Sequence, residues 1–245
     1  MGNREYDGIA DAYKDSKKLS FRKYIEEYTL FKLLDNISGK EVLDLACGEG
    51  FYTRKIKQTG ARYVLGVDIS SEMIALAKKQ EEIDPIGCQY LLHDVSTLEL
   101  RNKVDIVTGV YLMNYAKSAD ELLQFCKVVY DSLKPGGMFI GFNDNVAANP
   151  NLAPSFQKYG FEKTTSVDQS EGDVVQYTIF NGDGSAFSIN NYYLKPETYS
   201  WAFKTAGFSD FTWEGPFLNP QQKENPFWDD LLTHVPLIGL RAIKK

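Results

Sequence analysis

Short apolar runs alternate with helix-like stretches along most of this chain, and this alternation restricts the fold more than any other feature. The runs are rich in β-branched and aromatic residues, which is typical of strands. They span residues 41–46, 62–68, 88–94, 104–110 and 137–143. Most of the segments between them have apolar residues at helical spacing, as in 71–82. Strands that alternate with helices indicate a parallel sheet with helices packed against it.

Further elements surround this core. Residues 21–36 have the broad apolar pattern of a packed helix. Ser118 and Glu121 form a capping-box pattern at the start of another helix, which the Pro-Gly-Gly at 135–137 must end. The remaining predicted elements are a β-hairpin of 174–180 and 187–194, a helix over 195–208 and late strands within 211–217 and 235–245.

The domain organisation follows from the chain length and from where the alternation of strands and helices stops. A chain of 245 residues with 43% hydrophobic residues can bury one large core, so we expect a single domain over 1–245. Residues 144–195 differ in texture from the alternating part, and we interpret them as an insertion that carries the hairpin.

Composition argues against several partners. The net charge of -6 and the pI of about 5.1, with basic residues scattered among acids, argue against nucleic acid. No apolar run approaches membrane-spanning length, and the charged N-terminus does not resemble a signal peptide. Three cysteines without a CxxC pair predict reduced thiols, so we expect a cytoplasmic protein; oligomeric state is not predicted.

The first apolar run ends in an unusual turn, DLACGEG at 44–50. Gly48 and Gly50 allow a ligand to approach the backbone, and Ala46 keeps the turn thin. A GxGxxG dinucleotide turn would need a third small residue where this chain has Thr53. Asp44 would repel a pyrophosphate and attract an ammonium group, so the turn favours a ligand with positive charge.

Two more aspartates end the next two runs. Asp68 lies 18 residues beyond Gly50, where a carboxylate can accept hydrogen bonds from both hydroxyls of a ribose. Asp94 or its neighbouring backbone can bind the exocyclic amine of adenine. Either aspartate alone could simply cap a helix. The three acids together predict a nucleoside joined to an ammonium-bearing group.

These motifs resemble those of the class I S-adenosylmethionine-dependent methyltransferases. VLDLACGEG is similar to the first motif of the family, VLGVDIS to its ribose-binding strand, HDV to its adenine-contacting segment and VDIVTGVYLMNYA to the strand beside the methyl group. Ala46 departs from the usual glycine. The resemblance implies a Rossmann-like, mostly parallel seven-stranded α/β sheet with helices on both faces and an antiparallel C-terminal strand.

The resemblance also implies a cofactor, S-adenosylmethionine, which leaves as S-adenosylhomocysteine, and a set of cofactor contacts. These are Tyr13, Arg22, Asp44, Ala46, Gly48, Asp68, Ile69, Met73, Asp94, Val95, Val110 and Tyr115. Arg22 would hold the carboxylate of the cofactor, although an ordinary exposed arginine is the alternative.

The N-terminal YDGIADAY is similar to the lid of small-molecule members, so residues 1–36 would be lid helices. Its tyrosines, Tyr6 and Tyr13, would close over the site, with core packing as the alternative. Tyr6, Tyr111 and Asn114 are the predicted substrate contacts. Aromatic residues of the insertion either wall a substrate pocket or pack an ordinary core. GEGFYTR, YLMNYA and PFWDDLLTH are more weakly similar to the azapteridine, toxoflavin-type N-methyltransferases.

Methyl transfer from a sulfonium needs alignment of the acceptor more than a nucleophilic side chain. A nitrogen acceptor of low pKa needs no base, so the lack of an obvious base favours nitrogen over oxygen in a small aromatic or heterocyclic molecule. No carboxylate lies between 109 and 115, so we predict no metal. Cys47, His93 and His234 are interpreted as structural. A nicotinamide-dependent oxidoreductase and a non-catalytic S-adenosylmethionine-binding protein remain the alternatives.

Overall fold

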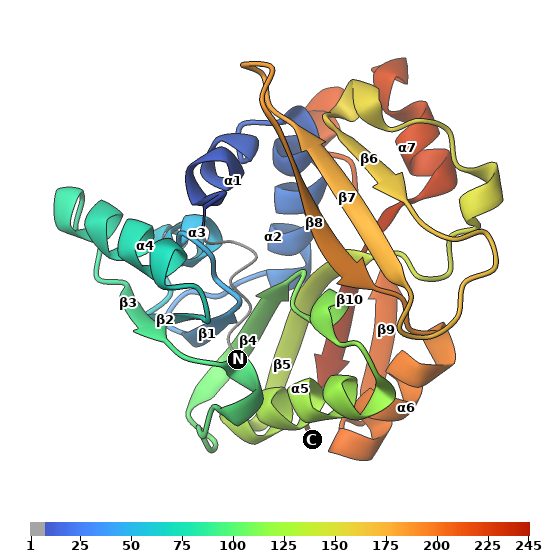
Figure 1. The fold of residues 1–245 in the computed structure, drawn as a ribbon. Coiled ribbons are helices and arrows are strands. Elements are labelled where there is room, and N and C mark those ends of the chain that lie inside the picture. The colour runs from blue at the N-terminus through green and yellow to red at the C-terminus, as the bar shows by residue number, and fades with distance from the viewer. Residues whose placement is uncertain (1–7) are drawn as a thin grey trace.

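The computed structural model describes residues 8–245, which form two β-sheets surrounded by helices (Figure 1). The larger sheet has seven strands in the order β3-β2-β1-β4-β5-β10-β9. Its strands are β1 (Glu41–Leu45), β2 (Tyr63–Asp68), β3 (Gln89–Leu92), β4 (Val104–Val110), β5 (Leu133–Asp144), β9 (Asp210–Glu214) and β10 (Leu237–Ile243).

Neighbouring strands from β3 to β5 run parallel, and β10 is antiparallel to both β5 and β9. The predicted sheet class is therefore confirmed, including its antiparallel last strand. The order reverses at β1, which pairs with β2 on one side and with β4 on the other. In parallel α/β sheets a ligand crevice forms at such a reversal, beyond the carboxyl ends of the strands.

Helices cover both faces of the sheet because its strands are apolar on both sides. Val42 of β1 packs into a core with α2 (Tyr28–Leu34) and α3 (Phe51–Gln58). The next residue, Leu43, packs into a second core with α5 (Ala119–Ser132) and α6 (Pro196–Ala206). Alternation of this kind, with both faces buried, explains the continuous apolar runs in the sequence.

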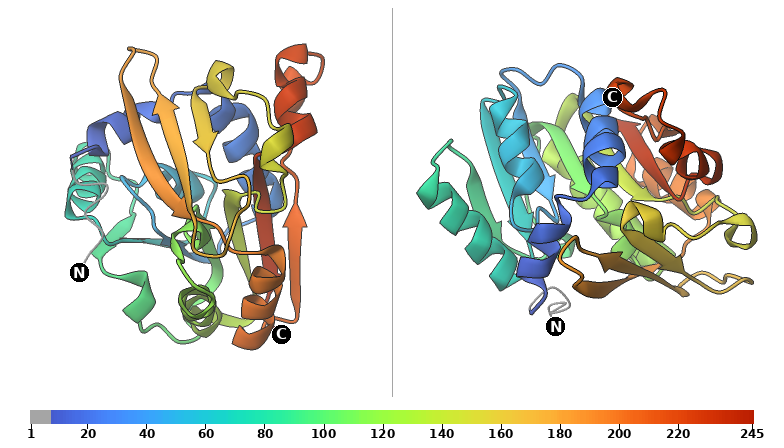
Figure 2. Two further views of the ribbon diagram at one scale, coloured as in Figure 1. Left: turned by 45° about the vertical axis from the view of Figure 1, so that its right-hand side comes forward. Right: turned by 90° about the horizontal axis from the view of Figure 1, so that it is seen from above.

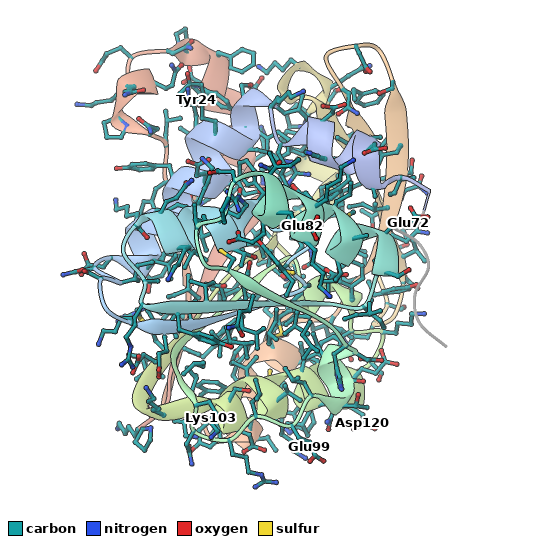
Figure 3. All side chains as sticks on the ribbon, turned by 90° about the vertical axis from the view of Figure 1, so that its left-hand side faces the viewer. Tyr24, Glu72, Glu82, Glu99, Lys103 and Asp120 are labelled. Carbon is teal, nitrogen blue, oxygen red and sulfur yellow. The ribbon has the colours of Figure 1, made fainter. Side chains whose placement is uncertain are left out.

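Helix α4 (Ser71–Ile83) lies against β2 and β3 at one end of the sheet. The side chain of Ser70 caps it by accepting a hydrogen bond from the amide of Met73. Its buried face contains Met73, Ile74 and Ala77, whereas Glu72 and Glu82 are exposed (Figure 3). The helix therefore has the polarity that its sequence spacing predicts.

A second, antiparallel sheet lies over the carboxyl ends of the parallel strands (Figures 1 and 2). It consists of β6 (Phe161–Thr164), β7 (Val174–Phe180) and β8 (Ala186–Tyr192). The predicted hairpin of β7 and β8 is confirmed, and β6 adds a third strand that the sequence did not indicate. Helix α1 (Ala10–Ser16) contacts β8, as the view from above shows (Figure 2, right).

Most boundaries shift by a few residues from the prediction, and two elements begin differently. The helix expected over 21–36 begins as a π-helical turn, Arg22–Glu27, and continues as α2. Strand β5 begins at Leu133 rather than at 137, with a register shift against β4 between Val104 and Ile106. The remaining elements are α7 (Asp229–His234) and the 3-10 turns Val95–Thr97, Met113–Tyr115, Pro150–Leu152, Gln157–Tyr159, Pro220–Gln222 and Pro226–Trp228.

No helix within 8–245 is long and apolar enough to cross a membrane.

Candidate cofactor and substrate site

A cavity of about 440 Å³ lies where the strand order reverses. It is bordered by the segments that follow β1, β2, β3 and β4 and by the start of α5. Most of the predicted site residues line it. These are Tyr13, Ala46, Gly48, Asp68, Ile69, Met73, Asp94, Val95, Val110, Tyr111 and Tyr115. Its size is within the range of small-molecule and cofactor sites.

Both glycines of the turn after β1 have left-handed backbone conformations, with φ of 56° at Gly48 and 83° at Gly50, but their surroundings differ. A Cβ atom on Gly48 would lie 3.8 Å from Tyr13 Cε1 and 3.9 Å from Met73 Sδ, both of which line the cavity. A Cβ atom on Gly50 would lie 2.5 Å from the hydroxyl oxygen of Tyr90, which is too close. The absence of a side chain at Gly48 leaves the space beside Tyr13 and Met73 free, whereas at Gly50 it leaves room for the ring of Tyr90 from β3.

Ala46 has a left-handed backbone conformation, with φ of 55°. Glycine adopts this conformation without the steric cost that a Cβ atom imposes. The chain therefore carries strain at the position where the resemblance leads one to expect glycine.

Asp68 lies at the end of β2 and is only 9% exposed. Its carboxylate accepts hydrogen bonds from the amide of Gly48 at 2.8 Å and from that of Ser70 at 2.9 Å. Burial raises the pKa of this carboxyl group, and the backbone hydrogen bonds oppose that rise. Asp68 thus fixes the glycine turn, and its carboxylate can still accept a hydrogen bond from a ligand.

Asp44 does not line the large cavity but borders a small one of about 10 Å³ beside it, together with Tyr13, Gly48 and Lys17. Its carboxylate accepts hydrogen bonds from the hydroxyls of Thr53, at 2.6 Å, and of Thr108, at 2.8 Å. Burial raises the pKa of Asp44 to about 6.

Lys17 borders the small cavity beside the candidate site, and this position was not predicted from the sequence. Its side chain is buried next to the turn after β1, with Nζ 4.7 Å from the ring centre of Tyr13 and 3.9 Å from Glu26 Oε1. Lys17 and Asp44 border the same small cavity and place opposite charges on it. The only hint in the sequence was its position four residues after Tyr13.

Arg22 is buried away from the large cavity and forms an ion pair with Glu26, with 2.7 Å between Nη1 and Oε2. Glu26 also accepts hydrogen bonds from the hydroxyls of Tyr52, at 2.6 Å, and Tyr111, at 2.5 Å. Burial alone would raise the pKa of Glu26, but the charges of Arg22 and Lys17 hold it below its usual value. Burial and the charge of Glu26 raise the pKa of Tyr111 well above its usual value.

A second small cavity, of about 20 Å³, lies between this cluster and the three-stranded sheet. Tyr13 and Tyr111 line both this cavity and the large one. The small cavity is also lined by Phe21, Arg22, Phe161, Tyr177, Ile179, Ile189, Asn191 and Leu237. It is called the inner cavity below.

The other predicted site residues have varied positions. Asn114 is buried outside the large cavity, and its Oδ1 accepts a hydrogen bond from the amide of Asp144 at 3.2 Å. Asp94 is exposed and caps the 3-10 turn after β3 by accepting from the amide of Ser96 at 2.8 Å. Tyr6 lies outside the described residues.

Burial raises the pKa of the Cys47 thiol well above its usual value, which fits its interpretation as a structural residue.

Several lining residues were not predicted: Ser96, Leu112, Lys117, Glu121, Gln124 and Phe125. Glu121 belongs to the capping box, which was interpreted only as the start of a helix. Gln124 donates a hydrogen bond to the backbone oxygen of Ser96 at 2.8 Å and so joins α5 to the turn that Asp94 caps. Within residues 8–245 there is no group of three or more His, Cys, Asp or Glu side chains placed to hold a metal ion.

Comparisons with known proteins agree with this geometry. Residues 42–137 match the family described as "Methyltransferase domain". A ubiquinone biosynthesis O-methyltransferase of Coxiella burnetii is 31% identical over 129 residues, which cover 51% of each chain. An N-demethylindolmycin N-methyltransferase of Streptomyces griseus is 24% identical over 180 residues, which cover 74% of each chain.

The fold also matches solved structures. An S-adenosylmethionine dependent methyltransferase from Mesorhizobium loti aligns with a TM-score of 0.64 at 20% identity, covering 89% of this chain and 97% of that one. The strand order, the cavity at the strand-order reversal and the matched domain lead to one conclusion. Residues 42–137 form a methyltransferase domain, and the chain has the fold of S-adenosylmethionine-dependent methyltransferase structures.

Proposed function

We propose that this enzyme transfers the methyl group of S-adenosylmethionine to a nitrogen, or alternatively an oxygen, of a small aromatic or heterocyclic molecule. The observation that carries the proposal is the position of Tyr111, which lines both the large cavity and the aromatic inner cavity. A cofactor in the first would lie next to an acceptor in the second.

The large cavity fits the nucleoside part of the cofactor. Asp68 offers carboxylate lone pairs to ribose hydroxyls. Asp94 and Val95 border the end where adenine would lie, and Ile69 and Met73 supply apolar walls. Gly48 leaves free the space that a side chain would occupy.

The amino-acid part of the cofactor fits the charges beside the large cavity. Asp44 would attract its ammonium group, and Lys17 would attract its carboxylate. We therefore propose Lys17 for the role that the sequence suggested for Arg22, because Arg22 is already paired with Glu26.

When bound, S-adenosylmethionine supplies a methyl group on a positively charged sulfur, which keeps the electrons of the broken bond as S-adenosylhomocysteine forms. The acceptor lone pair forms the new bond in line with the old one. Alignment of this kind contributes roughly 7–11 kcal/mol in favourable intramolecular cases. The chain's own part is to orient the acceptor and to exclude water.

The protonation states of Tyr111 and Glu26 favour nitrogen as the acceptor atom. The raised pKa of Tyr111 keeps its hydroxyl protonated, and the lowered pKa of Glu26 makes that carboxylate a weak base. Neither group is suited to remove a proton from a phenol before transfer. A nitrogen lone pair needs no such step, and any proton on that nitrogen leaves to water afterwards. The names of the two relatives include one N- and one O-methyltransferase.

We propose that no metal takes part, since no carboxylate follows β4 between 109 and 115. We also propose that residues 1–36 act as a lid and that 144–195 form an insertion over the acceptor. The acidic net charge and the three buried free cysteines support a small-molecule substrate rather than nucleic acid, and a cytoplasmic location.

The nicotinamide alternative is not favoured by the turn after β1. Thr53 occupies the position of the third glycine of a dinucleotide turn, and its hydroxyl holds Asp44. A non-catalytic role on the same fold would show cofactor binding without turnover.

The test is a panel of small aromatic amines, ring nitrogens and phenols, with release of S-adenosylhomocysteine as the readout. We expect turnover with at least one nitrogen acceptor, insensitive to EDTA. Turnover confined to phenols would reject nitrogen as the acceptor atom. Cofactor binding without turnover on any member would support the non-catalytic alternative.

A further inference from the structure

The inner cavity contains two polar groups that the fold leaves unsatisfied. Arg22 Nε and Asn191 Oδ1 have no hydrogen-bond partner among the described residues, although each residue is only 2% exposed. Both residues line this cavity. Unpaired buried polar groups are costly, so each of these two groups calls for a partner such as a bound water, ion or ligand.

The two groups have complementary chemistry. Nε of an arginine can only donate a hydrogen bond, and Oδ1 of an asparagine can only accept one. Nη1 of the same guanidinium is already bound to Glu26. A ligand that satisfies both groups must present an acceptor atom to Arg22 and a donor to Asn191.

The surrounding charges are balanced. Of the residues that line the inner cavity, Arg22 alone carries a charge, and Glu26 compensates it. The hydroxyl of Tyr177 donates to Asp144 at 2.5 Å, and Lys163 pairs with that carboxylate at 2.6 Å. A charged ligand here would lose its hydration without gaining a free counter-ion.

The remaining walls are apolar. Phe21 and Phe161 pack with ring centres 4.8 Å apart, and Ile179, Ile189 and Leu237 complete the lining. Such walls suit a flat ring. The cavity of about 20 Å³ holds little more than one water, so a ring can enter only when α1 or the three-stranded sheet moves outward.

We propose that the methyl acceptor is an uncharged planar heterocycle carrying a carbonyl or ring-nitrogen acceptor and an N–H or O–H donor, read by Arg22 and Asn191. This inference rests on the proposed function, since it deepens the description of the acceptor. Asn191 is a specificity-determining residue, and a hydroxy-heterocycle or lactam is the class of molecule that meets both requirements.

The test uses two ring systems, and each is represented by an uncharged, an anionic and a cationic compound. The quinoline set is 4-quinolone, 4-quinolone-2-carboxylate and 4-aminoquinoline, and the pyridine set is 2-pyridone, 6-hydroxynicotinate and 4-aminopyridine. Binding to protein saturated with S-adenosylhomocysteine is measured by calorimetry at pH 7.5. We expect an uncharged member to bind at least about tenfold more tightly than its charged counterparts. Tighter binding of a charged member, or no binding of either uncharged member, would overturn the inference.

Three variants test whether Asn191 binds the methyl acceptor. Asn191→Leu keeps the branched shape and removes the acceptor, so affinity for the uncharged member should fall about tenfold. Asn191→Asp should move the preference toward the cationic member. Asn190→Leu is the matched control, because the neighbouring side chain lies on the opposite face of β8 and should leave affinity unchanged. Unchanged affinity in both Asn191 variants would contradict the assignment.

A separate measurement of cofactor affinity distinguishes failure of the acceptor inference from failure of the proposed function. If S-adenosylmethionine binds the wild-type chain and the Asn191 variants equally well but the acceptor pattern is absent, only the acceptor inference fails. If S-adenosylmethionine does not bind, the proposed function itself fails.

Discussion

Asp68 connects the large cavity to the turn that shapes it, because its carboxylate accepts a hydrogen bond from the amide of Gly48. Asp68→Ala should weaken S-adenosylmethionine binding by about 10- to 100-fold, since a hydrogen bond to a charged group contributes about 1.5–3 kcal/mol. Titration calorimetry measures the change. Asp183→Ala, in the exposed turn between β7 and β8, is the control. An unchanged dissociation constant for Asp68→Ala would remove this residue from the site.

The pKa of Asp44 predicts how cofactor binding depends on pH. Its pKa of about 6 in the free protein means that the carboxyl group is largely protonated below that pH. In the proposed complex the ionised form of Asp44 binds the cofactor ammonium, so affinity should rise from pH 5 and level off above about pH 6, with a slope of up to about tenfold per unit. Calorimetry between pH 5 and 7 tests this, where the α-amino group of the cofactor stays charged.

Asp44→Asn should bind more weakly and flatten most of this profile. Burial also raises the pKa of Asp68, so a shallow dependence should remain. A variant with the full wild-type slope would show that another group controls it.

Ala46 offers a test of backbone strain. With φ of 55°, Ala46→Gly should raise the free energy of unfolding by up to about 1 kcal/mol, because relief of the left-handed cost outweighs the added chain entropy. Urea unfolding measures it. Ala116→Gly is the matched control, because Ala116 has an ordinary φ of -67° and should lose stability. A loss in both variants would argue against strain at Ala46.

Single residues also differ in how far the sequence could predict their positions. Asp68 and Gly48 were predictable because strand ends and glycine turns leave a local pattern. Lys17 was not, because Lys14, Lys17 and Lys18 are alike in sequence and only packing decides which of them turns inward. Asn191 carried no signal, since its unpaired oxygen arises from a fold assembled out of distant segments.

Several elements meet at Glu26. It lies in the π-helical turn and accepts from Tyr52 of α3 and from Tyr111 after β4. Glu26→Gln should lower the free energy of unfolding by about 3–5 kcal/mol, because it leaves the buried Arg22 without a counter-charge. Denaturant unfolding tests this.

Asp15→Asn is the control for Glu26→Gln. It breaks the exposed pair with Lys18 and should cost less than about 1 kcal/mol. Adding Arg22→Met to Glu26→Gln should recover part of the loss. Equal effects of Glu26→Gln and Asp15→Asn would mean that the buried pair does not join these elements.

The elements differed in how well the sequence predicted them. The strands of the large sheet were predictable because burial on both faces makes continuous apolar runs. Strand β6, with four residues, is too short to show alternation and depends on its pairing with β7. The π-helical turn was not predictable either, because its apolar spacing is close to that of an α-helix and its widening depends on tertiary contacts.

For the whole molecule, cofactor binding should stabilise the fold. A ligand present at 100 times its dissociation constant adds about 2.7 kcal/mol to the free energy of unfolding. For a chain of this size that corresponds to a rise in Tm of about 5–10 °C. Differential scanning fluorimetry with S-adenosylhomocysteine tests this, and NAD at the same concentration is the control. A larger shift with NAD would revive the oxidoreductase alternative.

Tyr13 forms a wall of both the large cavity and the inner cavity. A ligand that orders this ring from one side prepares the surface that the other ligand meets, so the two affinities are linked, and by the same factor in either direction. Each ligand should therefore bind more tightly to the chain already saturated with the other than to the free chain.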